Sequence, residues 1–279
     1  MLRQGLAVLT FSAVETFLRE RTGEVLSALT NRKLTFSDLS SSLQTAITVG
    51  ALEGVRFRLK LQRPADKISW LVTNLAPIAN ATTDIQRLSD HSFGYAASNL
   101  DEGVVKDILK AFGVLDPWNQ MTHLTRRVGL ALPSCESEFE TIKNRRHASA
   151  HALTSTVPFI DLQNSLKSSL AICLTFDLLL SHCLGLHNQR QVPGVSGNPK
   201  VSQSDIKLLF VEPRLGTNKF GVRREQSPPP SPPLARATIR VFSNEVDACM
   251  FAENYISSRQ CQLVILESSL SPVRWTTWL

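Results

Sequence analysis

The stretch Arg145-Arg146-His147-Ala148-Ser149-Ala150-His151 decides how this chain is interpreted. It places permanent cations, two imidazoles and a hydroxyl within about two turns of a predicted helix. A guanidinium such as that of Arg146 can hold a phosphodiester oxygen with a planar fork of donors. An imidazole such as that of His151 titrates near neutral pH and can transfer a proton. The stretch, called the Arg/His run below, therefore predicts a phosphate-handling site and favours RNA cleavage.

Two other interpretations of the run stay open. Arg145 and Arg146 can form a solvated helix face, with both histidines in ordinary surface or core positions. His147 and His151 are four residues apart and share one face of a helix, which is a spacing for zinc ligands. However, no acidic or Cys ligand accompanies them within the next turns, and the arginines would repel a divalent cation. We therefore expect neither a metal nor a cofactor.

Composition and charge limit the class of protein. The 279 residues suit one large domain and a small one, and 43% hydrophobic with 19% charged residues is ordinary for a globular protein. The net charge of +6 and the pI near 9.2 favour a polyanionic partner. Cations gather in sequence around the Arg/His run and are expected to bind substrate; they are Arg126, Arg127, Lys143 and Arg145.

Cysteine usage and hydropathy predict a cytoplasmic protein. The five cysteines are odd in number and widely spaced, which is typical of reduced thiols. Residues 1–5 lead straight into a helical pattern, without an apolar signal core. The longest apolar-rich stretch, Leu170 to Leu184, is interrupted by Asp177 and His182 and is too short to span a bilayer. We expect no membrane insertion.

Apolar periodicity predicts a helical domain over residues 1–186. The first expected helices are Leu6–Leu29, one that is capped at Ser37 or Asp38 and runs towards Leu61, and one from Pro64 through Leu75. The next is Asp101–Phe112, with Asn99 as its cap and Gly113 at its end. The last three are a short helix from Pro117, one after Ser134 that carries the Arg/His run, and Phe159–Leu184. Residues 89–100 are expected to form a loop.

Beyond this domain the composition changes. Turn-forming residues predict a linker at 187–200, followed by a small α/β part at 201–279. Its expected elements are strands at 206–211, 237–242 and 263–266 and a helix at 245–258. Residues 227–233 form a proline-rich insert, which is either a stiff exposed loop or a docking peptide. The predicted fold is mainly α with a small C-terminal α/β appendage.

Several stretches resemble one family. With the Arg/His run, residues 11–19, 92–112 and 116–118 are similar to the RiboL-PSP-HEPN-like group of the HEPN superfamily, whose helical domains carry an Arg-x4-6-His signature. The similarity covers about residues 1–186. It implies a HEPN-like helical bundle and does not extend to the C-terminal part.

The resemblance also implies a mechanism. In that superfamily the motifs of two subunits meet in a cleft and cut RNA without a metal. By resemblance, Arg146 neutralises the scissile phosphate, His151 acts as general base or acid, and His147 orients Arg146 or shares the proton transfer. The products would carry 2',3'-cyclic phosphate and 5'-hydroxyl ends. Arg145 also stands at an allowed spacing, so either arginine fits, with Arg146 favoured.

The resemblance leaves the biological setting open. It implies RNA and a second copy of the chain as partners, and a phage-defence or toxin-antitoxin setting with a possible antitoxin or defence partner. Some related toxins carry a regulatory Tyr two residues after the motif His, but this chain has Leu153 there. The alternatives are a catalytically silent module that binds RNA, nucleotide or protein, and a C-terminal part that carries the activity itself.

Overall fold

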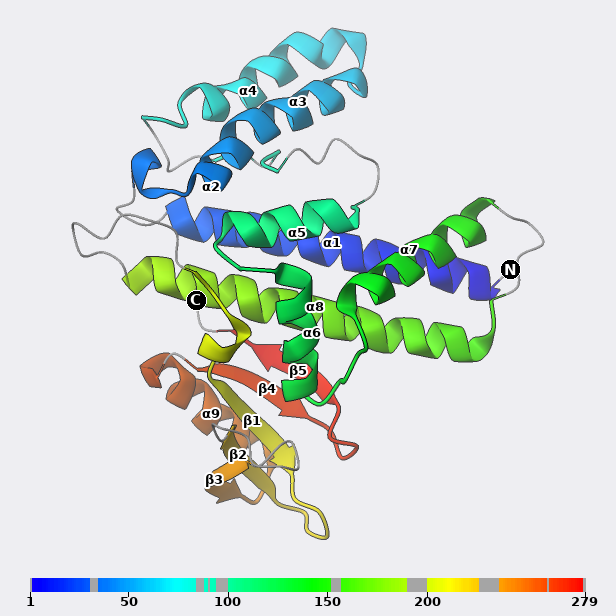
Figure 1. Ribbon diagram of the computed structural model, residues 1–279, viewed down its shortest axis with the longest axis vertical. Helices are drawn as coiled ribbons and strands as arrows, with labels where there is room; N and C mark the ends of the chain where they lie inside the picture. The colour runs from blue at the N-terminus through cyan, green and yellow to red at the C-terminus, as the bar shows by residue number, and fades with distance from the viewer. Residues whose placement is uncertain are drawn as a thin grey trace.

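The protein consists of a helical body and a small sheet layer (Figure 1). The computed structural model describes residues 2–30, 35–83, 88–89, 91–93, 100–151, 157–189, 200–225, 236–259 and 261–277. Helices α1–α8 form the helical body, and five strands with α9 form the sheet layer. The expected class, mainly α with a small C-terminal α/β appendage, is confirmed.

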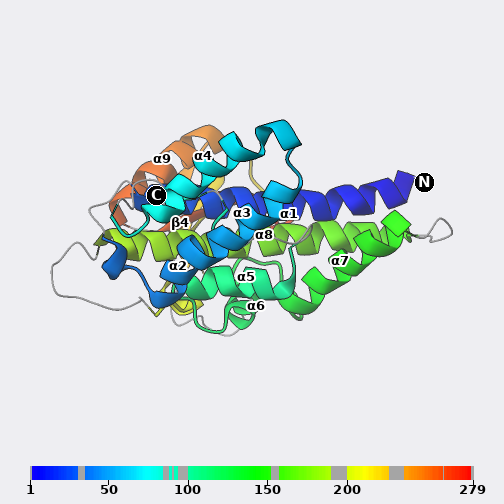
Figure 2. The ribbon, with the colours of Figure 1, turned by 90° about the horizontal axis from the view of Figure 1, so that it is seen from above.

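Three long helices form the frame of the helical body. They are α1 (Leu2–Thr30), α7 (Cys135–His151) and α8 (Phe159–Gln189). Helices α1 and α8 run side by side in the same direction, and α7 runs against them (Figures 1 and 2). The end of α7 therefore lies beside the beginnings of α1 and α8. We call this region the run end of the body, because α7 carries the Arg/His run there.

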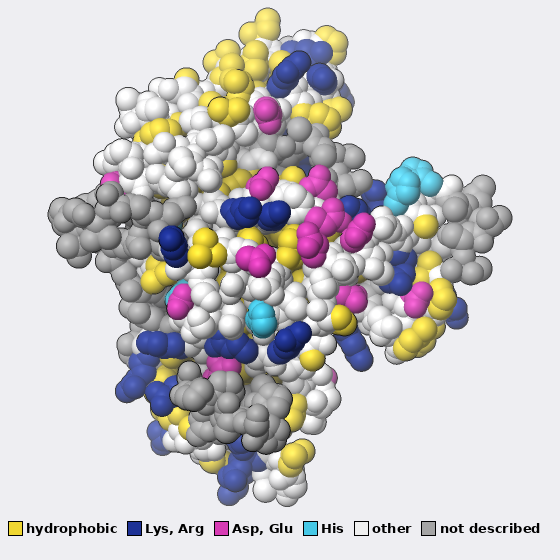
Figure 3. Space-filling view, in the orientation of Figure 1, with side chains coloured by type: hydrophobic (Ala, Val, Ile, Leu, Met, Phe, Trp, Pro, Cys, Tyr) yellow, Lys and Arg dark blue, Asp and Glu magenta, His cyan; other side chains and the backbone are white. Residues whose placement is uncertain are grey.

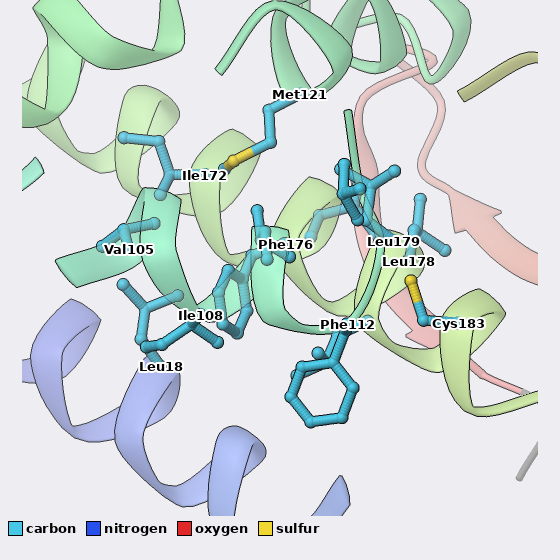
Figure 4. Close-up of a cluster of buried hydrophobic side chains, with 14 of the residues drawn as sticks. Leu18, Val105, Ile108, Phe112, Met121, Ile172, Phe176, Leu178, Leu179 and Cys183 are labelled. Atoms are coloured by element: carbon cyan, nitrogen blue, oxygen red, sulfur yellow. The ribbon is translucent and has the colours of Figure 1, made fainter. Parts of the chain in front are cut away.

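The main hydrophobic core lies where α5 (Glu102–Ala111) and α6 (Pro117–Arg127) cover α1 and α8. Figure 4 shows side chains from these elements directed into one cluster, including Leu18, Ile108, Met121 and Phe176, each fully buried. Apolar burial of this kind is the dominant favourable term in folding. Burial also accounts for the apolar character of α8, which is longer than expected. By length and composition Phe159–His187 could cross a membrane, but 78% of its most apolar 18-residue segment is buried inside the molecule.

The segment after α1 corrects one expectation. A single helix from Ser37 or Asp38 was expected, whereas the chain forms a 3-10 turn at Phe36–Asp38, α2 at Ser41–Thr45, a π-helical turn at Ala46–Gly50 and α3 at Ala51–Lys60. Ser40 caps α2, because its Oγ accepts the Leu43 N–H at 3.0 Å. The Asp38 carboxylate instead accepts the hydroxyl and backbone N–H of Thr35, and these bonds lower its pKa.

Several local signals act as expected. Pro64 opens a 3-10 turn, Pro64–Asp66, that leads into α4 (Lys67–Ala79). Gly113 ends α5 at a φ of 98°, a backbone conformation that favours glycine. Pro117 begins α6. At the start of α5, Asp101 is the cap and accepts the Val104 N–H at 2.8 Å, while Asn99 lies outside the described residues.

The sheet layer has the strand order β3-β2-β1-β4-β5. Its elements are β1 (Leu208–Pro213), β2 (Phe220–Glu225), β3 (Arg236–Phe242), α9 (Glu245–Arg259), β4 (Gln262–Leu266) and β5 (Pro272–Thr276). Strands β1 and β4 pair in parallel, and the other pairs are antiparallel. The expected β1, β3, β4 and α9 are confirmed. Strands β2 and β5 were not predicted, because polar residues interrupt their apolar patterns.

The sheet layer packs directly against the helical body. One sheet face packs on α9, and the other contributes Phe210 and Val264 to the main core. The Gln262 side-chain amide donates to the Leu178 carbonyl of α8 at 2.7 Å. Within the expected linker, residues 190–199 lie outside the described part, as does the proline-rich insert.

Candidate functional site

Helix α7 positions the Arg/His run. It begins after Ser134, whose Oγ accepts the Ser137 N–H at 3.2 Å. Phe139 and Ile142 are buried, and the Phe139 ring meets Phe11 of α1 edge to face with centroids 5.5 Å apart. These contacts fix the first turns of α7 against α1. The last two turns carry the run and have no buried residue, so the run lies on the surface at the run end of the body.

The two histidines of the run lie together on the surface. The ring centroids of His147 and His151 are 4.6 Å apart, with the rings tilted by 51°. Both residues are exposed. Figure 3 shows imidazoles on an outer edge of the molecule where α7 ends. Two imidazoles at this distance can pass a proton to the same substrate or share one.

The two arginines of the run have different surroundings. The guanidinium of Arg145 lies 3.3 Å from an Asp161 carboxylate oxygen and donates to the Ser165 hydroxyl and the Asp161 carbonyl of α8. Arg145 therefore ties α7 to α8, and its charge is already neutralised.

Arg146, unlike Arg145, forms no ion pair within the described part of the chain. Its Nε is shielded from solvent and has no hydrogen-bond partner among the described residues. The Ser149 hydroxyl, one turn further along α7, is also buried without a partner in the described part of the chain. Buried polar atoms without partners are uncommon, but Gln262 Oε1 in the sheet layer is another, so this state alone does not mark a functional site. Of the two arginines that the spacing allowed, Arg146 is the one that no carboxylate in the described part of the chain neutralises.

Lys143 forms an ion pair inside the helical body. Its ammonium contacts both carboxylate oxygens of Glu102, at 2.5 and 2.7 Å, and both side chains are about three-quarters buried. This ion pair joins the middle of α7 to the start of α5. Lys143 thus lies two residues before the run, and Glu102 neutralises its charge.

Arg126 and Arg127 are not brought to the run. They end α6, which points towards the sheet layer (Figure 1). Arg127 contacts both carboxylate oxygens of Glu225, at 2.5 and 2.9 Å, and donates to the carbonyls of Gln203 and Ile206. With its donors engaged in this way, Arg127 connects the sheet layer to the body, which corrects its expected place in a substrate site. Arg126 is exposed at the same end.

An apolar rim surrounds the run end. Ala7 packs with Val157 and Leu162, so the start of α1 contacts the start of α8. Large side chains on both helices nevertheless stay exposed; they are Leu2, Leu6 and Leu9 of α1 and Phe159, Ile160 and Leu166 of α8, with 45 to 81% of their surface accessible. Exposed apolar groups gathered in this way are typical of a protein-protein contact.

Two acidic partners in this region were not predicted from the sequence. Asp161 neutralises Arg145 of the run, and Glu102 neutralises Lys143 just before it; the hydroxyl of Ser149, which the sequence placed in the run, is buried. Asp161 and Glu102 are far from their partners in sequence, so no local pattern identifies them. Ser149 belongs to the run, and its spacing of three residues from Arg146 was the available signal. Among the described residues, no three His, Cys, Asp or Glu side chains gather closely enough to hold a metal ion.

The comparison with known families gives the class of the protein, which is that of the HEPN domains. A family model, RiboL-PSP-HEPN, matches residues 1–182, and the chain belongs to this family. Membership places it among ribonuclease-type or nucleotide-binding modules. No curated protein and no solved structure matches the chain.

Proposed function

We propose that this protein is a metal-independent endoribonuclease. The observation that carries the proposal is the contrast within the run: Arg145 is neutralised by Asp161, whereas no carboxylate in the described part of the chain pairs with Arg146, and the same run carries an exposed histidine pair. A guanidinium that keeps its charge can bind a phosphodiester. Membership of the RiboL-PSP-HEPN family supports the same class of reaction.

The proposed mechanism assigns one task to each side chain. Arg146 neutralises charge on the phosphoryl oxygens as the transition state forms. His151 removes the proton from the ribose 2'-hydroxyl, or supplies one to the leaving 5'-oxygen. His147, whose ring contacts that of His151, orients Arg146 or shares the proton transfer. The oxygen–phosphorus bond to the 5'-oxygen breaks as the 2'-oxygen attacks, which leaves 2',3'-cyclic phosphate and 5'-hydroxyl ends.

The site is proposed to be completed by a second copy of the chain. Cleavage needs an acid and a base around one scissile bond, and two copies related by a twofold axis would supply two Arg146 and two His151. The apolar rim lies at the same end of the body and offers the contact area that offsets repulsion between the two runs. Lys143 and Arg145 remain proposed contacts for the RNA backbone if substrate displaces Glu102 and Asp161, and the exposed Arg126 could bind RNA only beyond the run.

Chelation and end-group analysis test the chemistry. RNA cleavage is expected to continue in EDTA, to leave cyclic phosphate ends, and to disappear in His151→Ala. DNA is expected to resist, because it lacks the attacking 2'-hydroxyl. Strict dependence on added Mg²⁺ or Mn²⁺ would overturn the proposal, as would unchanged cleavage by His151→Ala.

Mixed dimers test the composite site. Arg146→Ala chains and His151→Ala chains are each expected to be inactive, and their mixture is expected to regain part of the activity. Leu6→Glu in the apolar rim should yield inactive monomers in sedimentation, whereas Leu215→Glu, an exposed control in the sheet layer, should not. Full activity from a monomer would contradict the dimer.

The second candidate is a catalytically silent module that binds RNA, nucleotide or a partner protein. It predicts RNA binding that depends on Arg146 without any cleavage. With the endoribonuclease we also propose a cytoplasmic location and a role in phage defence or toxin-antitoxin control, with an antitoxin or defence protein as partner.

A further inference from the structure

The hairpin of α3 and α4 projects from the helical body on the side away from the sheet layer (Figure 1). Its inner side is anchored by His91. Gly54 of α3 lies so close that an added Cβ would stand 2.8 Å from the His91 carbonyl oxygen. The Trp70 ring of α4 lies 5.6 Å from the His91 ring, and Asn74 Oδ1 lies 3.0 Å from His91 Nε2. This face of the hairpin is therefore occupied.

The outer face of α4 is apolar and uncovered. No residue of α4 is buried, and Ile68 and Val72 expose 79% and 65% of their surface. Ala76 and Ala79 continue the same line and are also exposed. The steps of four, four and three residues are those of a seam that packs on another helix. We call these four residues the α4 seam.

Positive charge borders the seam. Residues 56–67 contain five cations and one acid, Asp66; the cations are Arg56, Arg58, Lys60, Arg63 and Lys67. All of the cations except Lys67 are exposed. Figure 3 shows Lys and Arg side chains directly beside hydrophobic ones at the outer end of this hairpin. An apolar strip with a basic border complements an apolar strip with an acidic border.

We propose that the α4 seam binds an amphipathic helix of another protein, whose own apolar seam is flanked by Asp and Glu. A second copy of this chain fits less well, because two seams paired in parallel would bring the cations of both hairpins together. Two seams paired antiparallel would set each basic end beside the uncharged residues 68–79 of the other copy, without an acid to match the cations. A membrane surface also fits less well, because Trp70 packs on His91 and Phe57 is half-buried, so neither aromatic ring is free to anchor in an interface. The site is separate from the run and does not depend on cleavage.

Two synthetic peptides serve as probes. Both are helices of about three heptads with Leu at the seam positions, and they differ only in carrying Glu or Lys at the flanking positions. Fluorescence anisotropy with the full chain is expected to show binding of the Glu peptide at least tenfold tighter than that of the Lys peptide. Binding should weaken as salt rises, because charge complementarity contributes to it.

Variants locate the contact. The pair Ile68→Glu and Val72→Glu in one chain should weaken binding of the Glu peptide at least tenfold, with RNA cleavage retained if the run is catalytic. The pair Arg58→Glu and Lys60→Glu leaves three cations and three acids in residues 56–67, so both peptides should then bind about equally, whereas an unfolded chain would bind neither. Val246→Glu on α9, where Val246 is 67% exposed, is the matched control and should bind as wild type.

Several outcomes would overturn the proposal. Equal binding of both peptides to the wild-type chain, or binding unchanged by the seam variant, would remove the acidic helix as the occupant. Self-association that is lost in the seam variant would assign the seam to a second copy. Seam-dependent binding to vesicles of phosphatidylserine and phosphatidylcholine, without binding of the Glu peptide, would assign it to a membrane.

Discussion

Two regions of the molecule use arginine in opposite ways. Where the sheet layer meets the helical body, Arg21 lies 2.6 Å from Asp177, donates to Ser181 and Thr277, and is 7% exposed, while Trp275 of β5 donates to the same carboxylate. At the run end, Arg146 keeps a shielded Nε without a partner in the described chain.

The difference separates stability from function. A charged group whose donors are all paired holds elements together, and removing one partner leaves a buried charge. An unpaired buried donor lowers stability and is retained where a ligand completes it. We call the contact between the sheet layer and the helical body the junction. We therefore expect variants at the junction to destabilise the protein and variants in the Arg/His run to inactivate it, and the predictions below test that division.

The largest expected effect is on catalysis. Arg146→Ala should lower RNA cleavage by at least about 100-fold, because it removes charge stabilisation of the transition state. Its Tm should equal or slightly exceed that of the wild type, since a buried unpaired donor is also removed. Cleavage rates and thermal unfolding of the same sample measure both effects. A large fall in Tm would show that Arg146 is structural.

The next effect is on stability at the junction. Asp177→Ala leaves the buried Arg21 with only the exposed Glu24 as a charged partner and removes the acceptor of the Trp275 indole, so it should lower the free energy of unfolding by about 3 to 5 kcal/mol. Glu24→Gln is the matched control, because Glu24 also contacts Arg21 at 2.6 Å but is 62% exposed, and its effect should stay within about 1 kcal/mol. Urea unfolding measures both values. Similar losses in the two variants would contradict the comparison.

Arg127→Ala should cost less, about 2 to 3 kcal/mol, because its contacts with Glu225 and two carbonyls are partly exposed to solvent. Its neighbour Arg126 is exposed, so Arg126→Ala should change stability by no more than about 0.5 kcal/mol. Once Arg127→Ala is folded at low temperature, its cleavage rate per folded molecule should match wild type. A selective loss of cleavage would return Arg127 to the substrate site.

Acid should weaken the junction through His182 of α8. Burial lowers the pKa of His182 below its ordinary value of 6.5, and Lys207 lowers it further, while Asp205 opposes them. The unfolded chain therefore binds a proton more readily, so stability is fully present above about pH 6.5 and falls as the pH drops towards the folded pKa. His182→Gln should show a shallower loss of stability between pH 6.5 and 5. An unchanged slope would exclude His182 as the cause.

The smallest effect is a change in thiol reactivity. Burial raises the pKa of Cys135 to about 12 and raises that of Cys183 as well, so both should resist iodoacetamide at pH 8 in the folded protein. Asp177→Ala should speed labelling of Cys183, six residues away on α8, by opening the junction locally. Arg146→Ala should not. Equal acceleration by both variants would show that the two regions are coupled.

Much of the helical body could be predicted from local signals. Pro64, Gly113 and Pro117 mark helix boundaries through backbone constraints that act within a few residues. The broken helix at 36–60 could not be predicted, because the competing caps at Thr35 and Ser40 are both compatible with the sequence. Strands β2 and β5 depend on partners distant in sequence, and periodicity alone does not reveal such pairing.

The sequence by itself indicated the class of the protein through the resemblance of the Arg/His run and of other helical stretches to the RiboL-PSP-HEPN group, which the family model over residues 1–182 confirms. The run could be recognised in the sequence because it is contiguous and lies on one helix. Only the tertiary structure decided which arginine stays available. Asp161 and Ser165 reach Arg145 from α8, Glu102 reaches Lys143 from α5, and Glu225 reaches Arg127 from β2. Ion pairs form between residues that folding brings within a few ångströms, and that proximity is not encoded in any local pattern.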